Sequence, residues 1–444
     1  MNRSVVRALI GVVVVILVLV GAGGAFFWWK VSTLKESLVR DLGHALGAHV
    51  EVTSVELDLW KGDLHIAGIT LVNERPEAPW DKGAIAQATV HFHLSDLFSP
   101  SLPLSVKVSD WNVVLHSYSA GAAPADASAS TPPETPDSSS SASHGHAVHV
   151  TDLTAQDGSV DIHLADNQQV ALRQVSFTAG DNGAGIWTTE LEAASVTAGT
   201  LMASGCSVKI RGDHDKVSFS ELRMTCGQGF IGGHGDVALA APHEANIVLK
   251  ATTVPVSMLL SSPWQMKISG NVTGDVTYTG ADQSASAQGH LAMDQAKFNM
   301  LPWLGKITAM VSLPDFSDVE LDQATSDFLW KDHLFHFTNI DLRKNDVARI
   351  AGSVDLGAQE QIDGRLKLGF PSAVTAKWPD LQDKIFNVAT DGFNWADVHV
   401  TGTPDHLDED LTARVLAVGV QSGSDVIKNA TDKASDLLKS FMGN

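Results

Sequence analysis

Two groups of histidines along the chain have the local density of a metal site. His91 and His93 alternate along an expected strand, and His144, His146 and His149 lie close together in the sequence. A zinc site normally adds cysteine pairs or two histidines at His-Glu-x-x-His spacing on a helix, and the sequence contains neither pattern. We therefore expect His91 and His93 to lie on a solvated strand face and the second group to bind no specific metal.

Other motifs that resemble catalytic or phosphate-binding sites have simpler structural explanations. The glycine-rich run at 232–235 has no following helix to present backbone amides to a phosphate, which indicates a turn or a bulge. The serines at 261–262 lack the G-x-S-x-G pattern of a nucleophile elbow. The acidic run at 405–410 precedes an expected helix, whose N-terminus carboxylates stabilise. The sequence therefore predicts a protein that is not an enzyme and that carries no metal or cofactor.

An apolar segment near the start of the sequence indicates on which side of a membrane most of the chain lies. Residues 8–29 form an unbroken apolar run that begins at Ala8 and ends with Trp28 and Trp29. About 20 apolar residues in a helix cross the hydrocarbon of a bilayer, and tryptophans favour the headgroup boundary. We predict a transmembrane anchor, with residues 1–7 in the cytoplasm and the bulk of the chain outside it. A cleaved signal peptide is the alternative, because small residues at 20–25 resemble a cleavage site.

The charge of the chain limits its partners. Among 444 residues, 51 are acidic and 30 are basic, which gives a formal net charge of −21. Nucleic-acid binding needs a basic stripe that releases counterions, so this partner is excluded. Broad electrostatic contact with anionic lipid headgroups is also disfavoured. Any lipid contact beyond the anchor should therefore be apolar.

Cys206 and Cys226 lie in the part of the chain expected outside the cytoplasm, where a disulfide can persist. A bridge across a loop of this length would stabilise the fold by roughly 3 kcal/mol. A tight hairpin turn at 212–215 would place the two cysteines out of direct register, so the bridge would need a bulge or a strand slip. The sequence leaves the disulfide open.

Most of the chain after the anchor alternates polar and apolar residues, which is the pattern of antiparallel strands with one apolar face. An amphipathic stem helix is expected at 30–48, and a β region follows at 49–118, with a slip in the alternation near Asp110. The apolar face of this region includes Leu57, Leu59, Leu64, Ile66, Val90, Phe92, Val106 and Val108.

The rest of the chain is divided by composition. Residues 119–146 are rich in serine and proline and predict a disordered loop. Strands resume over 147–370, with a hairpin turn expected at Asp157-Gly158 and a helix near 302–311. The final segment, 371–444, is expected to be partly helical, with helices at 411–418 and 424–441. The predicted fold class is mainly β, with a few short helices and C-terminal helices.

Three stretches together resemble the AsmA-like family of bacterial envelope proteins. They are the strand block at 47–73 behind the anchor and stem, the Leu-Pro-Trp-Leu run at 301–304, and the block at 328–368 with its Gly-x-Val-x-Leu and Gly-x-Leu-x-Leu strands. The resemblance implies an elongated, curved antiparallel sheet shaped like a trough. Its apolar inner face would shelter phospholipid acyl chains between the inner and outer membranes, and the eight side chains named above would be candidates for this lipid groove. It also implies an inner-membrane protein with its bulk in the periplasm and a role in outer-membrane biogenesis.

The same apolar faces would also form the closed core of a β sandwich or barrel. A non-catalytic scaffolding or assembly protein of the envelope is therefore the alternative function. Strands about 4.8 Å apart limit about 20 strands to a reach of roughly 100 Å. This limit favours work with a partner protein in the periplasm or at the outer membrane.

Overall fold

The computed structural model describes most of the two expected β regions. The described residues are 39–40, 43, 47–58, 61–75, 80–93, 95, 101–116, 147–164, 168–181, 186–240, 242–281, 284–298 and 320–418. The predicted anchor at 8–29, the loop at 119–146, the helices at 302–311 and 424–441, and most of the stem lie outside these residues. In the part of the chain that is described, no helix is long and apolar enough to span a membrane.

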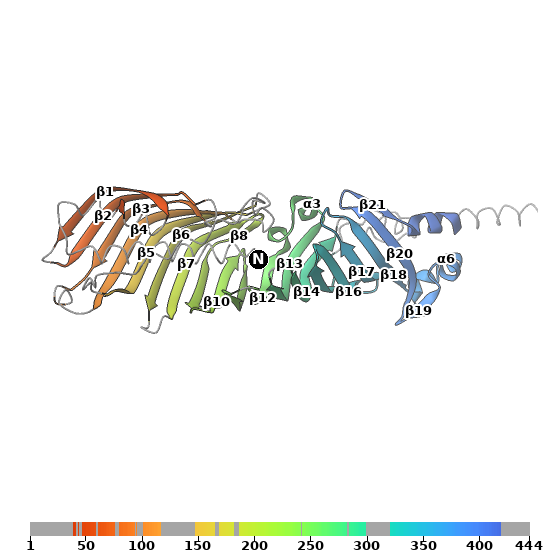
Figure 1. Cartoon of the computed structure of the whole chain (residues 1–444). Coiled ribbons are helices and arrows are strands. Elements are labelled where there is room, and N and C mark those ends of the chain that lie inside the picture. Colours follow the sequence, from red (N-terminus) through yellow and green to blue (C-terminus); the bar gives the residue numbers. More distant parts are fainter. Residues whose placement is uncertain are drawn as a thin grey trace, which may run out of the picture. The chain divides into compact units, whose positions relative to one another are not determined.

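Within the described residues, twenty-one strands are hydrogen-bonded into one largely antiparallel sheet, and the helices are short. The predicted mainly β class is therefore confirmed. The chain divides into two compact units: an N-terminal unit of residues 1–225 and 236–240, and a C-terminal unit of residues 226–235 and 241–444. Figure 1 shows the labelled strands following one another in chain order within each unit.

The N-terminal unit is a series of strands that pair mainly with their neighbours in sequence. The strands are β1 (Ala48–Asp58), β2 (Asp63–Asn73), β3 (Trp80–His91), β4 (Ser101–His116), β5 (Ala147–His163), β6 (Gln169–Asp181), β7 (Trp187–Ala198), β8 (Leu201–Ala203), β9 (Cys206–Gly212) and β10 (Lys216–Cys226).

One pair departs from the expected antiparallel arrangement. Strands β4 and β5 run parallel, from Ser101 opposite Ala147 to His116 opposite His163. Parallel neighbours need a connection of a dozen residues or more, because the chain must return to the end from which it started. The serine- and proline-rich segment occupies this connection, so its length has a topological reason that composition alone did not reveal.

The C-terminal unit contains the remaining strands and the short helices. They are β11 (Gly229–Ala238), whose last residues belong to the N-terminal unit, β12 (Ala245–Pro255), η3 (Val256–Met258), α3 (Ser262–Gln265), β13 (Ile268–Ala281), β14 (Ser284–Phe298), β15 (Gln323–Lys331), β16 (Leu334–Lys344), β17 (Ala348–Leu356), β18 (Ile362–Pro371), α5 (Ser372–Thr375), α6 (Pro379–Lys384), β19 (Val388–Thr390), β20 (Phe393–Thr403) and β21 (His406–Glu409).

A packed core closes one end of the C-terminal unit. Phe370 and Phe386 are both buried, with ring centroids 5.3 Å apart. The helix at 411–418 adds Leu411 and Val415 to the same cluster, so the helix predicted there is confirmed.

The acidic run before this helix acts as predicted. The Glu409 carboxylate accepts a hydrogen bond from the Thr412 amide at 2.9 Å, which caps the first turn of the helix. The preceding residues form β21, so only the end of the acidic run serves the cap.

A single left-handed residue interrupts many of the long strands. At these positions φ lies between 50° and 54°, and the affected residues are Asp110, Asp157, Gln174, Glu221, Thr253, Gln295 and Asn339. The strand register shifts at several of these points, which identifies them as β-bulges. A bulge inserts one extra residue and therefore reverses the phase of the side-chain alternation.

Strand β4 shows what this phase reversal achieves. Leu104, Val106 and Val108 are buried before Asp110, and Trp111 and Val113 are buried after it. Two apolar stretches that would lie on opposite faces of a regular strand thus share one face. The slip predicted near Asp110 is confirmed.

The prediction of a hairpin turn at Asp157-Gly158 is wrong. Both residues lie inside β5, where Asp157 takes the left-handed conformation of a bulge. Asp-Gly pairs favour this conformation in bulges as well as in turns, so the local signal was ambiguous. A side chain at Gly158 would collide with the indole of Trp111 on β4, so the glycine also permits close packing between the two strands.

The glycine-rich run at 232–235 is not a turn either. It lies within β11, and side chains at Gly233 and Gly235 would collide with the backbone of β12. Glycine here permits a close approach of two strands.

Deleting Asp110 should unfold the N-terminal unit. The deletion would turn Trp111, Val113 and Leu115 to the solvent side, and burial of each such side chain is worth about 1.5–3 kcal/mol. The matched variant Asp110→Gly keeps the residue count and suits the left-handed backbone, so its stability should change by no more than about 1 kcal/mol. Circular dichroism and protease resistance of the two variants measure the difference. A natively folded deletion variant would refute the role of the left-handed residue at position 110.

The bulge on β16 is fixed by polar contacts that give a second prediction. The Asn339 amide and the His290 ring contact the Asp327 carboxylate at 2.8 and 2.7 Å, and these hydrogen bonds, Asn339 first, hold the pKa of Asp327 below its ordinary value. A lowered pKa stabilises the fold above the unfolded pKa of about 3.9, and this contribution is lost as the pH falls through the folded pKa.

Asn339→Gly should raise the pKa of Asp327 toward its ordinary value, because glycine suits the left-handed backbone but removes the donor. Titration of the Asp327 carboxyl by NMR measures the change. Asp346→Gly is the control, because Asp346 is also left-handed, with φ of 59°, and is not among the groups that lower the pKa of Asp327. An unchanged Asp327 pKa in Asn339→Gly would contradict the interpretation.

Candidate functional site

The C-terminal unit contains a partly open apolar cavity of about 590 Å³. Its walls come from the strands β13 to β18, β20 and β21 and from the segment between β12 and β13. Apolar side chains make up nearly all of the lining; among the largest are Leu291, Met293, Phe328, Phe337, Ile340 and Leu366. The volume lies in the range of about 300–1,000 Å³ that is usual for ligand pockets.

The bulges direct side chains into this cavity. On β16, Phe335 and Phe337 line the cavity before the bulge at Asn339, and Ile340 and Leu342 line it afterwards. A regular strand would have presented residues 339 and 341 instead, and residue 341 is an aspartate. The left-handed residue thus keeps a charged side chain out of the cavity.

An aromatic cluster forms part of the wall. The rings of Phe335 and Phe337 are stacked, with centroids 5.9 Å apart, and each lies within 6.5 Å of Phe328 on β15. Phe335 remains 37% exposed although it faces a cavity among apolar neighbours. Its ring therefore offers uncovered apolar surface to a ligand.

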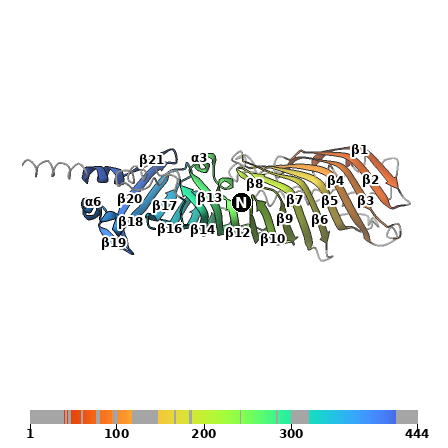
Figure 2. The ribbon, with the colours of Figure 1, turned by 180° about the vertical axis from the view of Figure 1, so that it is seen from behind.

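Residues 256–267, which we call the strap, cover the cavity. The strap comprises η3, α3 and the residues around them, and it contributes Leu259, Leu260 and Trp264 to the lining. Figures 1 and 2 show α3 and β21 at the same side of the C-terminal unit, at the top of both views.

Two residues of the strap make polar contacts with distant turns. The Ser261 hydroxyl donates to Glu360 Oε1 at 2.8 Å, in the turn between β17 and β18. Lys267 Nζ donates to Asp405 Oδ1 at 3.1 Å and to the Pro404 carbonyl, in the turn between β20 and β21. These contacts join residues 99 and 138 positions apart.

The register shows that the strap crosses the concave side of the sheet. Six strand spacings separate β13 from β20, which would be roughly 29 Å in a flat sheet. The strap lies at the end where β13 starts, whereas the turns that it contacts lie at the opposite ends of their strands. The strands from β13 to β20 must therefore curl around the cavity, with the strap across the gap.

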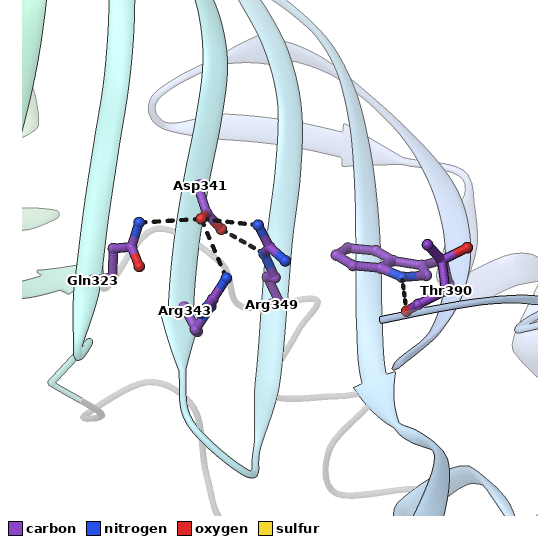
Figure 3. A network of polar contacts seen from close by, with 6 residues as sticks. Gln323, Asp341, Arg343, Arg349 and Thr390 are labelled. Carbon is purple, nitrogen blue, oxygen red and sulfur yellow. Dashed lines mark hydrogen bonds and ion pairs between the residues drawn. The ribbon is translucent and has the colours of Figure 1, made fainter. Parts of the chain in front are cut away.

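A polar network supports the cavity wall from its outer face. Asp341 accepts two hydrogen bonds from Arg349, from Nε at 2.6 Å and from Nη2 at 3.0 Å, and one from Gln323 Nε2 at 3.2 Å. Arg343 lies 3.6 Å from the same carboxylate (Figure 3). The network ties β15, β16 and β17 together behind the part of the wall formed by Ile340 and Leu342.

The groove candidates from sequence lie in the other unit. Leu64, Ile66, Phe92, Val106 and Val108 are buried on the inner face of the N-terminal unit. Two further candidates, Leu57 and Val90, are half-buried. The remaining predicted site residues, Leu59, Ala8, Trp28 and Trp29, lie outside the described residues. The cavity is thus lined by a different set of side chains, although by the same kind of alternation.

Sequence reasoning missed Phe335 and Phe337 as site residues. Their alternation in Phe-His-Phe could have indicated an apolar strand face. This run contributed only to the resemblance to the AsmA-like family. The strap residues carried no comparable signal, because their place over the cavity depends on contacts with turns far along the chain.

The cysteines, and those of the histidines singled out earlier that the structure describes, are not among the residues that line the cavity. Cys206 and Cys226 are both thiols, and Cys206 pairs with Met224, two positions from Cys226, so the expected mismatch of register is present. Burial raises the pKa of the Cys226 thiol. His91 contacts Asp63 across the strands at 2.7 Å and is 44% exposed, as expected for a solvated strand face.

His144 and His146 lie outside the described residues, and His149 lies on β5. Among the residues that the structure describes, no group of three or more His, Cys, Asp or Glu side chains is placed to hold a metal ion.

Comparison with protein-family models and with curated protein sequences finds no match for this chain. The site must therefore be interpreted from its own geometry and chemistry.

Lys267→Met should loosen the strap. Hydrogen bonds to charged groups contribute about 1.5–3 kcal/mol, but Asp405 is 69% exposed, so we expect a loss of about 1 kcal/mol. Amide hydrogen exchange in the strap should then accelerate about fivefold. The matched control is Lys250→Met, at an exposed position on β12. Unchanged exchange in Lys267→Met would show that this contact does not hold the strap.

Proposed function

We propose that this chain binds lipid acyl chains in the cavity of its C-terminal unit and takes part in phospholipid transport between bacterial membranes. The observation that carries the proposal is the apolar lining of the cavity. Of the described residues that form this lining, only Glu360 has a charged side chain. Exposing an acyl chain to water costs about 0.8 kcal/mol of free energy for each CH₂. An apolar cavity offsets this cost without any covalent step.

The sequence supports the cellular location that belongs to this proposal. The apolar run at 8–29 supports a single anchor in the inner membrane, with the rest of the chain in the periplasm. The acidic charge of the chain disfavours electrostatic attachment to anionic lipid surfaces, which supports contact with lipid through apolar surface. The resemblance to the AsmA-like family, with its trough-shaped sheet, supports the same role in outer-membrane biogenesis.

The transfer itself would use surface complementarity. The aromatic cluster and the aliphatic side chains of β13 to β18 would cover the tail, and the strap would shield it from water on the concave side. A lipid moves in such a site by exchanging one apolar surround for another, so no catalytic group is required. The limited reach of the chain supports a partner protein that accepts the lipid at the outer membrane.

A scaffolding protein of the envelope is the second candidate, and one observation favours it. In the N-terminal unit the inner-face side chains Leu115, Leu153 and Ala155 have no exposed surface. Such packing is typical of an ordinary core that presents its outer surface to partners. On this alternative the cavity would be a local packing feature.

Filling the cavity should block lipid binding. The experiment uses the full-length protein in isolated envelope membranes that contain a photoactivatable phospholipid, with mass spectrometry to locate the label. Label should attach to peptides of β14 to β18, and Leu366→Trp should reduce it at least fivefold because indole occupies the space of the tail. Leu329→Trp is the matched control, since Leu329 is 39% exposed and lies outside the lining.

Chain length gives an independent readout of the same site. Because a tail that enters from the bilayer exchanges one apolar surround for another, labelling should change little with added CH₂ while the tail fits, and it should fall once the tail is longer than the cavity can hold. Equal labelling of Leu366→Trp and the parent protein, or undiminished labelling by lipids whose tails are too long for the cavity, would favour the scaffolding alternative.

A further inference from the structure

One carboxylate lies at the edge of the apolar cavity. Glu360 is half-buried in the turn between β17 and β18, and it lines the cavity together with Ser261 from the strap. The other polar lining residues, Thr325 and Ser326, are uncharged. The formal charge presented by the described lining is therefore negative and comes from a single residue.

The backbone of Glu360 is in a conformation that does not suit glutamate. Its φ is 58°, in the left-handed region, and the turn is closed by hydrogen bonds from the Glu360 amide to the Gly357 carbonyl and from the Gly357 amide to the Gln361 carbonyl. Glycine or asparagine would meet this requirement with less strain. The turn thus explains the conformation but not the carboxylate, and strained residues of this kind cluster at functional sites.

The carboxylate has capacity for a second partner. Ser261 Oγ donates to Oε1 at 2.8 Å, whereas a carboxylate offers about four acceptor positions. The nearby cation of the strap, Lys267, contacts Asp405 instead and is not part of the lining. An incoming donor with positive charge would therefore meet an acceptor oriented by a hydroxyl, and an incoming anion would meet repulsion.

We infer that Glu360, held by Ser261, binds the ammonium group of a lipid whose tail occupies the cavity, so that the site selects amine-bearing, zwitterionic headgroups over anionic ones. This inference rests on the proposed function. A charge-assisted hydrogen bond is roughly twice as strong as a neutral one, and partial exposure to water reduces the gain. The expected preference is about tenfold.

The test separates the charge of Glu360 from its contact with the strap. Glu360→Gln keeps the side-chain length and the oxygen that accepts from Ser261, but it removes the charge. The full-length protein is reconstituted in vesicles that contain equal amounts of photoactivatable phosphatidylethanolamine and phosphatidylglycerol with identical acyl chains. The ratio of the two labels on cavity peptides is then measured.

The parent protein should favour phosphatidylethanolamine about tenfold, and Glu360→Gln should bring the ratio close to one while the summed label persists. Asp355→Asn is the matched control, because Asp355 contacts His336 at 2.8 Å and lies outside the lining, and it should leave the ratio unchanged. Equal ratios in Glu360→Gln and the parent, or a parent preference for phosphatidylglycerol, would overturn the headgroup inference and leave the acyl-chain site intact. No label on cavity peptides from either lipid would overturn both proposals.

Discussion

The apolar side chains of a strand must stay on one face. In this protein many strands keep them there although a left-handed residue interrupts the regular strand backbone. One left-handed residue near the middle of the strand adds a position and reverses the alternation, and the sequence reverses its own alternation at the same place. On β4 this arrangement buries Trp111 beside Val108, and on β16 it directs Ile340 inward and Asp341 outward. The packed inner face, the cavity and the outer ion pairs all depend on this match.

The same backbone arrangement produces a packed interior in one unit and a hollow one in the other. In the N-terminal unit, large side chains such as Leu115 and Leu153 fill the inner face. In the C-terminal unit, the strap spans the curl of the sheet and contacts the opposite turns, so the side chains beneath it do not meet at the centre. Whether an alternating face becomes a core or a binding site is therefore decided by what lies across it.

Local patterns predicted much of the fold, and contacts between distant residues account for the failures. The alternation, the slip near Asp110 and the helix at 411–418 depend on neighbouring residues and could be read directly from the sequence. The pair Asp157-Gly158 was misread because a turn and a bulge need the same backbone conformation. The cavity could not be placed from sequence, because it depends on the curl of the sheet and on a strap held by turns that are 99 and 138 residues away.

The strap also has a consequence for how the C-terminal unit unfolds. Its strands pair almost entirely with neighbours in sequence, and such linear arrays fray from their ends, much as repeat proteins do. The contacts of Ser261 and Lys267 link the first strands of the array to the last ones, so the array is closed by contacts between its two ends. Fraying at one end then strains contacts at the other, so these residues should unfold cooperatively, and a cavity in their midst can persist without a filled core.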